Sequence, residues 1–357
     1  MKKVLRRVAF TSATILLVCS GSAFAERGYV GSQTCFKCHP DQYNDFIVSG
    51  HSYKLSRAED AMKRPIPLPK GYTWDDISYV IGGKYKKSRY IDNNGFIITA
   101  AKDGSEMKNQ YNMQTGEWSF YHKGEKKPYS CGNCHTTGYQ KEGHQDGKEG
   151  LIGTWAAPGV QCEACHGPAG DHIKSDKAAK ENKLMLNTKL ALCGGCHIRG
   201  DKNKIPAKGG FIKHHEQFNE LLTGPHTEEN DISCVSCHNP HKMARLKTGI
   251  IATCGSCHED EQAAFAKNTH SQVGIQCREC HMPRASKSAV KVSSTEGDIR
   301  THIFKISTDA DAKMFSEDGK YAVGGYVTLD FACLNCHKNK DLKWAASKAA
   351  NMHAQNK

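Results

Sequence analysis

Residues 234–258 read CVSCHNPHKMARLKTGIIATCGSCH and contain two copies of the pentapeptide Cys-x-x-Cys-His. The whole chain of 357 residues holds eight such pentapeptides, numbered here motifs 1 to 8, and they include every one of its 17 cysteines except Cys19. Chance placement of the 17 Cys and 19 His would give fewer than one. In chain order the motifs are Cys35–His39, Cys131–His135, Cys162–His166, Cys193–His197, Cys234–His238, Cys254–His258, Cys277–His281 and Cys333–His337.

The spacing within each motif suits covalent attachment of haem c. Two thiols three positions apart can add to the two vinyl groups of one haem, and the adjacent His then supplies the proximal ligand of the iron. A disulfide framework does not need a His after each pair, and a zinc ribbon would have no role for a His after all eight pairs. We therefore predict eight c-type haems, each with its iron. Their covalent attachment points are Cys35, Cys38, Cys131, Cys134, Cys162, Cys165, Cys193, Cys196, Cys234, Cys237, Cys254, Cys257, Cys277, Cys280, Cys333 and Cys336, and their proximal ligands are His39, His135, His166, His197, His238, His258, His281 and His337.

Eleven histidines lie outside the motifs and can supply the second axial ligands. Eight are needed to fill every site, so three are expected to be ordinary surface or hydrogen-bonding residues. His122 and His144 are the weakest candidates. The distal candidates are His51, His172, His214, His215, His226, His241, His270, His302 and His353.

Spacing restricts which haem some of these candidates can serve. His241 follows the proximal His238 by three residues and cannot reach the opposite face of the same haem, so it should ligate a neighbouring haem. The same argument applies to His172, six residues after His166. His270 follows a predicted short helix over 259–267, and His353 ends a predicted Ala/Lys-rich helix after motif 8. His51 follows motif 1 in a similar way.

The adjacent pair His214 and His215 would point about 100° apart on a helix. The two rings could therefore serve different haems, or one could be idle.

The first 25 residues have the pattern of a secretory signal peptide. Four basic residues precede an apolar stretch over residues 8–18, and Ala23-Phe24-Ala25 gives the small-x-small pattern of a cleavage site. The apolar run is too short to span a bilayer. A lipoprotein signal ending at Cys19 is the alternative, but Val18 stands where such signals usually have a small residue. We expect an exported protein, periplasmic or outer-membrane-associated and extracellular, with no integral membrane segment after cleavage.

The net charge of +12 does not indicate nucleic-acid binding. Four of these charges belong to the predicted signal peptide, and the two propionates of each haem offset much of the remainder. Only 38% of the residues are hydrophobic, so haem macrocycles must supply much of the apolar core. We predict a mainly α and irregular, haem-cored fold.

The intervals between motifs divide the predicted cytochrome domain, residues 26–357. Motifs crowd together over residues 131–281, a dense haem array, and residues 282–357 form a C-terminal haem module. Residues 65–128, between motifs 1 and 2, read instead as a small antiparallel β insertion, with strands over 77–121 and a hairpin around Asn93-Asn94-Gly95. Its aromatic residues should cover haem edges and form a small local core, with a docking or substrate surface as the alternative. They are Trp74, Tyr79, Tyr85, Tyr90, Phe96, Trp118 and Tyr121.

Several stretches resemble multihaem c-type cytochromes related to cytochrome c-554. They are residues 35–51, 131–139 and the segment Gly159–Pro168, while residues 233–283 resemble periplasmic multihaem shuttles of metal- and sulfoxide-respiring bacteria. In those proteins a His before or after a motif typically ligates another haem, which the resemblance carries over to His226, His241 and His270. Residues 298–302 resemble a related ligand segment, and residues 331–353 a terminal haem module whose closing His is a ligand. The resemblance implies bis-His haems and electron relay.

These observations predict an octahaem cytochrome that relays electrons in anaerobic respiration. Its partners would be other redox proteins (cytochromes, quinol-linked or outer-membrane complexes), extracellular metal oxides or further copies of itself. Catalytic octahaem reductases often replace one motif His by Lys to keep an iron open, and all eight motifs here end in His. A reductase of a small nitrogen or sulfur oxyanion with one open-site haem is the first alternative. A subunit of an extracellular cytochrome filament is the second.

Overall fold

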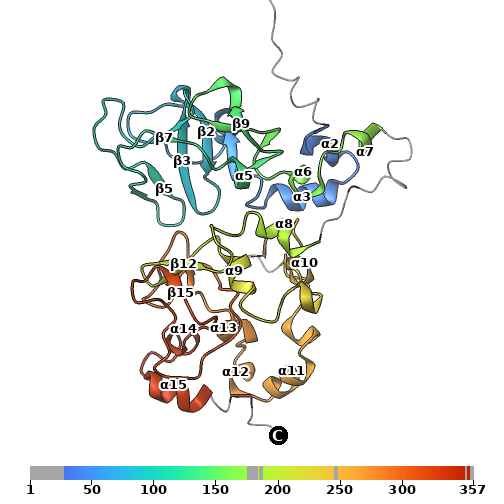
Figure 1. Cartoon of the computed structure of the whole chain (residues 1–357), viewed down its shortest axis with the longest axis vertical. Coiled ribbons are helices and arrows are strands. Elements are labelled where there is room, and N and C mark those ends of the chain that lie inside the picture. The colour runs from blue at the N-terminus through green and yellow to red at the C-terminus, as the bar shows by residue number, and fades with distance from the viewer. Residues whose placement is uncertain (1–27, 175–183, 185–187, 245–247, 350–351, 354–357) are drawn as a thin grey trace, which may run out of the picture.

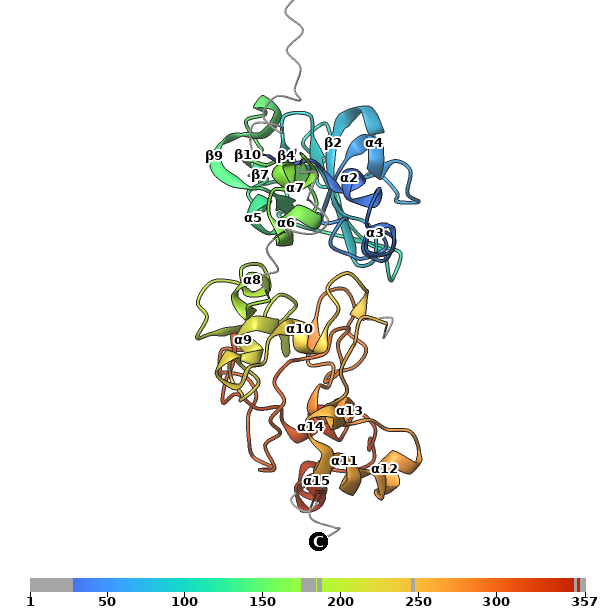
Figure 2. The same ribbon diagram turned by 90° about the vertical axis from the view of Figure 1, so that its right-hand side faces the viewer.

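The computed structural model describes residues 28–174, 184, 188–244, 248–349 and 352–353. They form two lobes, residues 28–174 and 188–353, stacked along the longest axis of the molecule (Figures 1 and 2). The upper lobe carries motifs 1 to 3 and the lower lobe motifs 4 to 8, so the predicted dense array spans both lobes. All 19 His and all 16 motif Cys lie in the described part. The predicted signal peptide, residues 1–25, lies outside the described residues.

The upper lobe places short helices beside a seven-stranded antiparallel sheet (Figure 1). The path β1-β2-β3-β4-β7 forms the main part of the sheet, and β5 pairs with β3 and with β6. The strands are β1 (Leu55–Arg57), β2 (Ile77–Gly82), β3 (Lys87–Asp92), β4 (Phe96–Ile97), β5 (Gln110–Asn112), β6 (Glu117–Ser119) and β7 (Lys127–Pro128). The antiparallel sheet predicted over residues 77–121 is therefore present, and it also takes in β1 and β7.

Alternation of side chains along the strands builds an apolar cluster on each face of this sheet. Tyr79 and Ile91 pack with Trp155 on one face, and Val80 and Tyr90 pack on the other. The predicted hairpin joins β3 to β4 through Gly95, which has φ 90°. A Cβ at Gly95 would lie 2.6 Å from the backbone nitrogen of Leu151, so both the turn and the packing require glycine. The aromatic residues of the insertion mostly form its local core.

The remaining elements of the upper lobe are short. The helices are α2 (Ser32–Phe36), α3 (Pro40–Ile47), α4 (Ala58–Ala61), η1 (Trp74–Asp76), α5 (Gly132–His135), η2 (Gln145–Gly147), α6 (Cys162–His166) and α7 (Gly170–Lys174). Two further strand pairs are β9 (Gln140–His144) with β10 (Ile152–Thr154) and β8 (Thr136–Thr137) with β11 (Ala157–Pro158). Helices this short depend on tertiary packing for their stability.

The lower lobe consists of short helices and loops around a small four-stranded sheet. Its helices are α8 (Leu190–Gly194), α9 (Gln217–Leu221), η3 (Glu228–Asn230), α10 (Cys234–Cys237), η5 (Cys254–Ser256), α11 (Glu259–Ala266), α12 (Thr269–Gln272), α13 (Cys277–His281), α14 (Leu329–Ala332) and α15 (Leu342–Ala349). The sheet has the order β14 (Ser286–Lys287), β13 (Phe211–Lys213), β12 (Ile205–Lys208) and β15 (Tyr321–Ala322). The helices predicted after motifs 6 and 8 are present as α11 and α15, whereas this sheet was not predicted.

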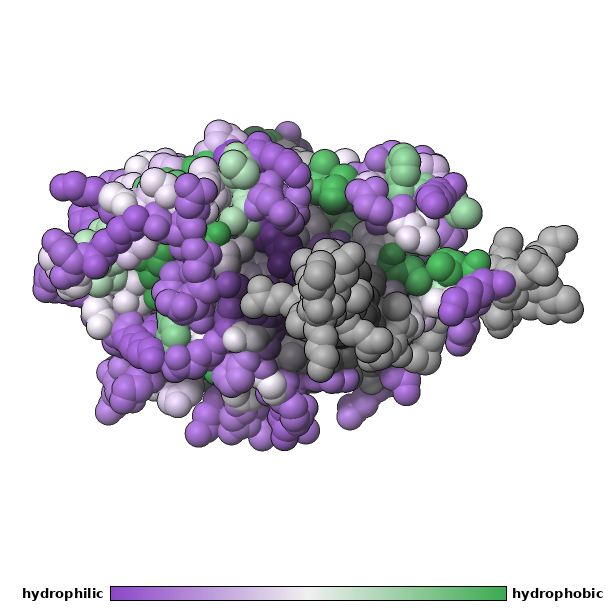
Figure 3. Space-filling view, turned by 90° about the horizontal axis from the view of Figure 1, so that it is seen from above, coloured by the Kyte–Doolittle hydropathy of each residue, from purple (hydrophilic) through white to green (hydrophobic). Residues whose placement is uncertain are grey.

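The two lobes make polar contacts through the turn between β2 and β3 and through the end of β5. Lys86 forms an ion pair with Asp298 at 2.6 Å, and the side-chain amide of Asn112 donates a hydrogen bond to the carbonyl of Ala289 at 2.9 Å. Seen from above, the visible surface of the upper lobe is mainly hydrophilic, with scattered hydrophobic groups (Figure 3). Within the described ranges no helix has the length and apolar character needed to cross a membrane.

Candidate haem-binding sites

Each motif lies on or directly after a short helical turn. The turn brings both thiols and the following His to the same side, because residues three and four apart are neighbours on a helix. The backbone N–H of the motif His donates to the carbonyl of the first Cys, for example at 2.8 Å in motif 1 and 2.9 Å in motif 4. All sixteen motif cysteines are free thiols in the described structure, so each pair is available to bind haem.

Seven of the eight proximal histidines face a second imidazole ring from elsewhere in the chain. The ring centroids of each pair are separated by a similar gap. The pairs are His39–His172 at 6.5 Å, His51–His197 at 6.4 Å, His166–His241 at 6.0 Å, His226–His258 at 5.9 Å, His238–His302 at 6.2 Å, His270–His337 at 5.8 Å and His281–His353 at 5.8 Å.

These gaps match the space that one iron needs between two imidazole ligands. A metal–nitrogen bond of about 2.0 Å and a ring radius of about 1.1 Å on each side separate the two centroids by about 6.2 Å. Rings packed directly on one another would be much closer, as His214 and His215 are at 3.6 Å. The residues present therefore fit haem iron at seven motifs.

The structure separates the histidines outside the motifs into those that face a proximal His and those that do not. His172, His241, His270 and His353 each face a proximal His other than that of the nearest motif, and His51 faces His197. His226 and His302 also face proximal histidines. His144 lies exposed in β9, and His122 pairs with Glu125 at 2.7 Å, so neither faces a motif.

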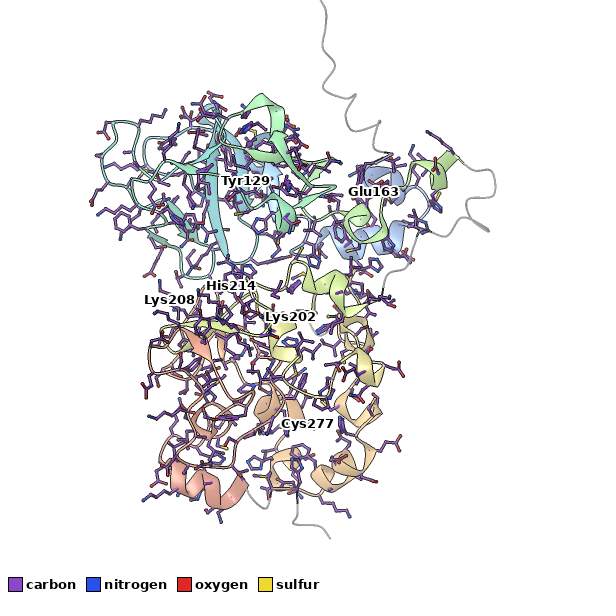
Figure 4. All side chains as sticks on the ribbon, viewed as in Figure 1. Tyr129, Glu163, Lys202, Lys208, His214 and Cys277 are labelled. Carbon is purple, nitrogen blue, oxygen red and sulfur yellow. The ribbon has the colours of Figure 1, made fainter. Side chains whose placement is uncertain are left out.

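The expectation for His214 and His215 was wrong in its geometry. Both residues lie in the turn between β13 and α9 rather than on a helix, so the helical geometry expected for them does not apply. They pack at 3.6 Å with an interplanar angle of 45°. Figure 4 shows His214 where the lower lobe meets the upper lobe.

Hydrogen bonds at the second ring nitrogen orient several of the facing histidines. His281 Nδ1 donates to the carbonyl of Phe304 at 2.8 Å, His197 Nδ1 to the side-chain oxygen of Gln217 at 3.1 Å, and His270 Nδ1 to Asn268 at 3.0 Å. Because Nδ1 then carries the proton, Nε2 keeps the lone pair that binds a metal. Sequence reasoning did not identify Gln217 or Asn268 as orienting residues.

Burial keeps three of the histidines at the motif sites neutral, as a metal ligand must be. Burial lowers the pKa of His51 to about 4 and that of His238 to about 4. It also lowers the pKa of His135 to about 3, and the positive charges of Lys54, Arg89 and Arg199 add to this effect. All three histidines are therefore unprotonated at neutral pH.

The motif cysteines lie next to one another from motif to motif. The thiol of Cys35 hydrogen-bonds that of Cys162, Cys193 that of Cys234, and Cys254 that of Cys277. Cys165 also lies close to Cys193, Cys237 to Cys254 and Cys257, and Cys280 to Cys333 and Cys336. The attachment points thus follow the order 1-3-4-5-6-7-8, from α2 and α6 in the upper lobe to α13 and α14 in the lower lobe (Figure 1).

Motif 2 lies beside this file as a branch. The thiol of Cys134 hydrogen-bonds that of Cys196 in motif 4, and each also lies 3.9 Å from a backbone carbonyl of the other motif. Motif 2 belongs to the upper lobe and motif 4 to the lower lobe, so this contact bridges the two.

Comparisons with known proteins match three haem-protein families over different parts of the chain. The matching models are described as cytochrome c554 and c-prime (residues 87–167), cytochrome c3 (residues 154–259) and outer membrane cytochrome MtrC/MtrF-like, domains II/IV (residues 250–357). A curated relative, the multiheme cytochrome MtrA of Shewanella baltica (strain OS185), is 27% identical over 170 residues, 44% of this chain and 46% of the relative. The chain thus spans about half the length of that relative.

Two solved structures share the fold at low sequence identity. The outer cell wall cytochrome OcwA has a TM-score of 0.62 and 19% identity, with 91% of this chain and 86% of OcwA covered. The octaheme sulfite reductase MccA of Wolinella succinogenes has a TM-score of 0.63 and 18% identity, with 93% and 67% covered.

Proposed function

Since the chain is a multihaem c-type cytochrome, we propose that it binds eight haems and relays electrons between redox partners or to an extracellular acceptor in anaerobic respiration. The observation that carries the proposal is the continuous file of motif cysteines from one lobe to the other. When bound, haem iron supplies reversible one-electron chemistry. The chain contributes covalent anchors, axial imidazoles and a low-polarity surround.

In this proposal the seven facing imidazole pairs are the axial ligands of seven haems. The distal ligands for motifs 1, 3, 4, 5, 6, 7 and 8 are, in that order, His172, His241, His51, His302, His226, His353 and His270. All seven come from the same chain, so these sites need no imidazole from a second protomer. Orienting hydrogen bonds at Nδ1 keep the rings in place in both oxidation states, which suits rapid electron transfer.

We propose export as the location, after cleavage at Ala25, because covalent haem attachment takes place outside the cytoplasm. The likeness to MtrA and to MtrC/MtrF-like domains supports partners among other cytochromes and outer-membrane complexes. In the same proposal, quinol-linked complexes are further electron donors, and metal oxides at the cell surface are further electron acceptors.

A stopped-flow experiment tests the relay. The protein is reduced by dithionite and mixed with a bulky ferric complex that can approach only the surface. If the motifs form a connected file, all haems should reoxidise. The rate of reoxidation, followed by haem absorbance, should then depend on the concentration of the ferric complex in the same way for every haem. A fraction that stays reduced after the exposed haems have reacted would show isolated haems and contradict the proposal.

One observation favours a second candidate function, reduction of a small nitrogen or sulfur oxyanion. His135 is the one proximal His that faces no imidazole among the described residues, and MccA, which shares the fold, is described as a sulfite reductase. Reduced protein mixed with nitrite, hydroxylamine, sulfite or tetrathionate distinguishes the candidates. Sustained turnover on the order of 1–10³ per second would establish the reductase. Slow, stoichiometric reoxidation leaves only the relay.

A further inference from the structure

The junction between the two lobes has no apolar side-chain core of its own. Each of the three buried apolar clusters lies within a single lobe, two of them in the upper lobe and one in the lower lobe. Each β-sheet also belongs to one lobe, and among the described residues no backbone hydrogen bond crosses from one lobe to the other. Burial of apolar side chains therefore stabilises each lobe separately.

Direct side-chain contacts across the junction are mainly polar. Lys86 pairs with Asp298, and Asn112 donates to a backbone carbonyl of the lower lobe. Asp45 in α3 pairs with Lys242 at 3.4 Å, but both side chains are more than a third exposed, so this ion pair contributes little. Contacts of this kind are typical of interfaces between domains that can move relative to one another.

Two of the facing imidazole pairs add a different kind of connection. His51 of the upper lobe faces His197 of motif 4 in the lower lobe at 6.4 Å, and His241 of the lower lobe faces His166 of motif 3 in the upper lobe at 6.0 Å. The lobes thus exchange one histidine each. The other five pairs each lie within one lobe. An iron at motif 3 or at motif 4 would therefore be bound by both lobes at once.

These two motifs also stand where the file of attachment points passes between the lobes. Cys165 of motif 3 lies close to Cys193 of motif 4, so the step from motif 3 to motif 4 carries the file across the junction. In Figures 1 and 2, α3, which follows motif 1, lies on the side of the upper lobe that faces the lower lobe. Electron tunnelling slows steeply with distance, so a relay through the whole molecule requires docked lobes.

The turn that carries His241 is fixed within the lower lobe. The His241 backbone N–H donates to Oδ1 of Asn239 at 3.0 Å, and the N–H of Lys242 donates to the Asn239 carbonyl at 3.1 Å. Gly249 packs so closely against this turn that a Cβ there would lie 2.9 Å from the carbonyl oxygen of Lys242. The turn begins directly after motif 5 and presents the His241 ring to His166 of the upper lobe.

Tyr85 of the upper lobe contacts the segments that carry both exchanged histidines. It lies in the bend between β2 and β3, where its hydroxyl donates to the carbonyl of Val48 and lies 3.3 Å from Sδ of Met243, a weak second acceptor. Val48 precedes His51 by three residues, and Met243, which is 8% exposed, follows His241 by two. The Tyr85 ring also packs against the glycine that precedes His51, 3.8 Å from the position its Cβ would take.

We propose that Tyr85 is a positioning residue that holds the exchanged ligands His51 and His241 at the junction, and that the two iron sites completed by these ligands lock the lobes together. A bond at either site keeps the lobes docked and so raises the local concentration of the ligand at the other site. Docking of the lobes and ligation at motifs 3 and 4 are therefore one cooperative event. This proposal rests on the proposed function, because it requires haem at both motifs.

Cyanide binding to the oxidised protein tests the cooperativity. Cyanide binds a bis-His iron only after one His has left, so its rate reports how often that ligand is free. His51→Ala opens the motif 4 site and should also accelerate binding at motif 3 by about 10-fold, so two more haems react rapidly than in the wild-type protein. His270→Ala opens a pair within the lower lobe and should add only one. If His51→Ala also adds only one, the two sites are independent and the proposal is wrong.

Tyr85→Phe tests the positioning role without removing a ligand, and it also serves if His51→Ala fails to mature. Loss of one hydrogen-bonding hydroxyl should accelerate cyanide binding at motifs 3 and 4 by about 3- to 10-fold, while the low-spin signals of the cyanide-free protein remain. Tyr72→Phe is the matched control, because the Tyr72 hydroxyl donates to the Ala100 carbonyl at 3.0 Å within the upper lobe. Wild-type rates in Tyr85→Phe would overturn the role of Tyr85.

Small-angle X-ray scattering measures the docking itself. The double variant His51→Ala/His241→Ala should have a larger radius of gyration than the wild-type protein, because few direct contacts then hold the lobes together. The double variant His270→Ala/His353→Ala opens two sites within the lower lobe and should keep the wild-type value. An unchanged radius in the first double variant would contradict the lock. A haem count below eight by intact mass would instead contradict the proposed function, so the two failures are distinguishable.

Discussion

Replacing Glu163 by Ala should loosen both sides of the motif 1 site at once. The side chain is 4% exposed and accepts backbone hydrogen bonds from three residues: Val30 at 3.0 and 3.2 Å, Gly31 at 2.9 Å and Ala169 at 2.9 Å. Val30 and Gly31 precede α2, which carries Cys35, while Ala169 precedes α7, which carries His172. Glu163 therefore connects the attachment helix of motif 1 to the ring that faces its proximal histidine (Figure 4).

The size of the effect follows from these three donors. A hydrogen bond to a charged group contributes about 1.5–3 kcal/mol, and water can replace part of it at the half-buried Val30 and Gly31. The local free energy of opening should therefore fall by about 2–4 kcal/mol in Glu163→Ala, which corresponds to about 30- to 1000-fold faster amide exchange. Glu163→Gln keeps one acceptor oxygen and should lose about half as much free energy.

Hydrogen exchange of peptides from residues 28–39 and 167–174, followed by mass spectrometry, measures this effect directly. Peptides from the lower lobe should exchange as in the wild-type protein, and Glu142→Ala, on an exposed side chain of β9, serves as the matched control. A change of less than about threefold in both upper-lobe peptides would refute the reasoning. It would mean that water satisfies the three N–H groups as well as Glu163 does.

Three further perturbations have defined outcomes. The fully buried Glu220 accepts hydrogen bonds from the Ser286 hydroxyl at 3.0 Å and from the His302 backbone N–H. Glu220→Ala should therefore lower the free energy of unfolding by about 2–4 kcal/mol in denaturant titrations and shift one haem potential. Glu220→Gln should cause a smaller change in both quantities. Burial opposes ionisation of Asp298, yet Lys86 and two backbone N–H groups lower its pKa below the ordinary value. The stability it adds is therefore present above about pH 4 and lost on further acidification, and Asp298→Asn should remove that part of the acid dependence in thermal melts. His270→Ala should add one high-spin haem in electron paramagnetic resonance. An unchanged spectrum would show that the ring facing His337 is not a ligand.

Local features of this fold could be predicted from the sequence because their causes are local. The motif turns follow from the spacing of the thiols, α11 from three acidic residues in its first turn, and the β3–β4 hairpin from Asn-Gly chemistry at Gly95. Spacing also indicated that His241 cannot serve its own motif. It could not indicate that His241 faces His166, because that contact depends on how the two lobes meet.

The features that escaped prediction depend on distant residues. The lower-lobe sheet is made of strands of two to four residues, such as β14 and β15, too short to show an alternating pattern. The three cations that help to lower the pKa of His135 are Lys54, Arg89 and Arg199, which lie more than thirty residues apart, so no window of the sequence holds them together. Nothing in the sequence around His214 and His215 indicates a turn. The helix α9 begins only after them, at Gln217.

The central claim, that every motif binds one haem covalently, is tested most directly by intact mass spectrometry of the fully matured protein under denaturing conditions. The account predicts the mass of residues 26–357 plus eight haems, because all sixteen motif cysteines are free and accessible to attachment. A mature protein that carries seven or fewer covalent haems would contradict it.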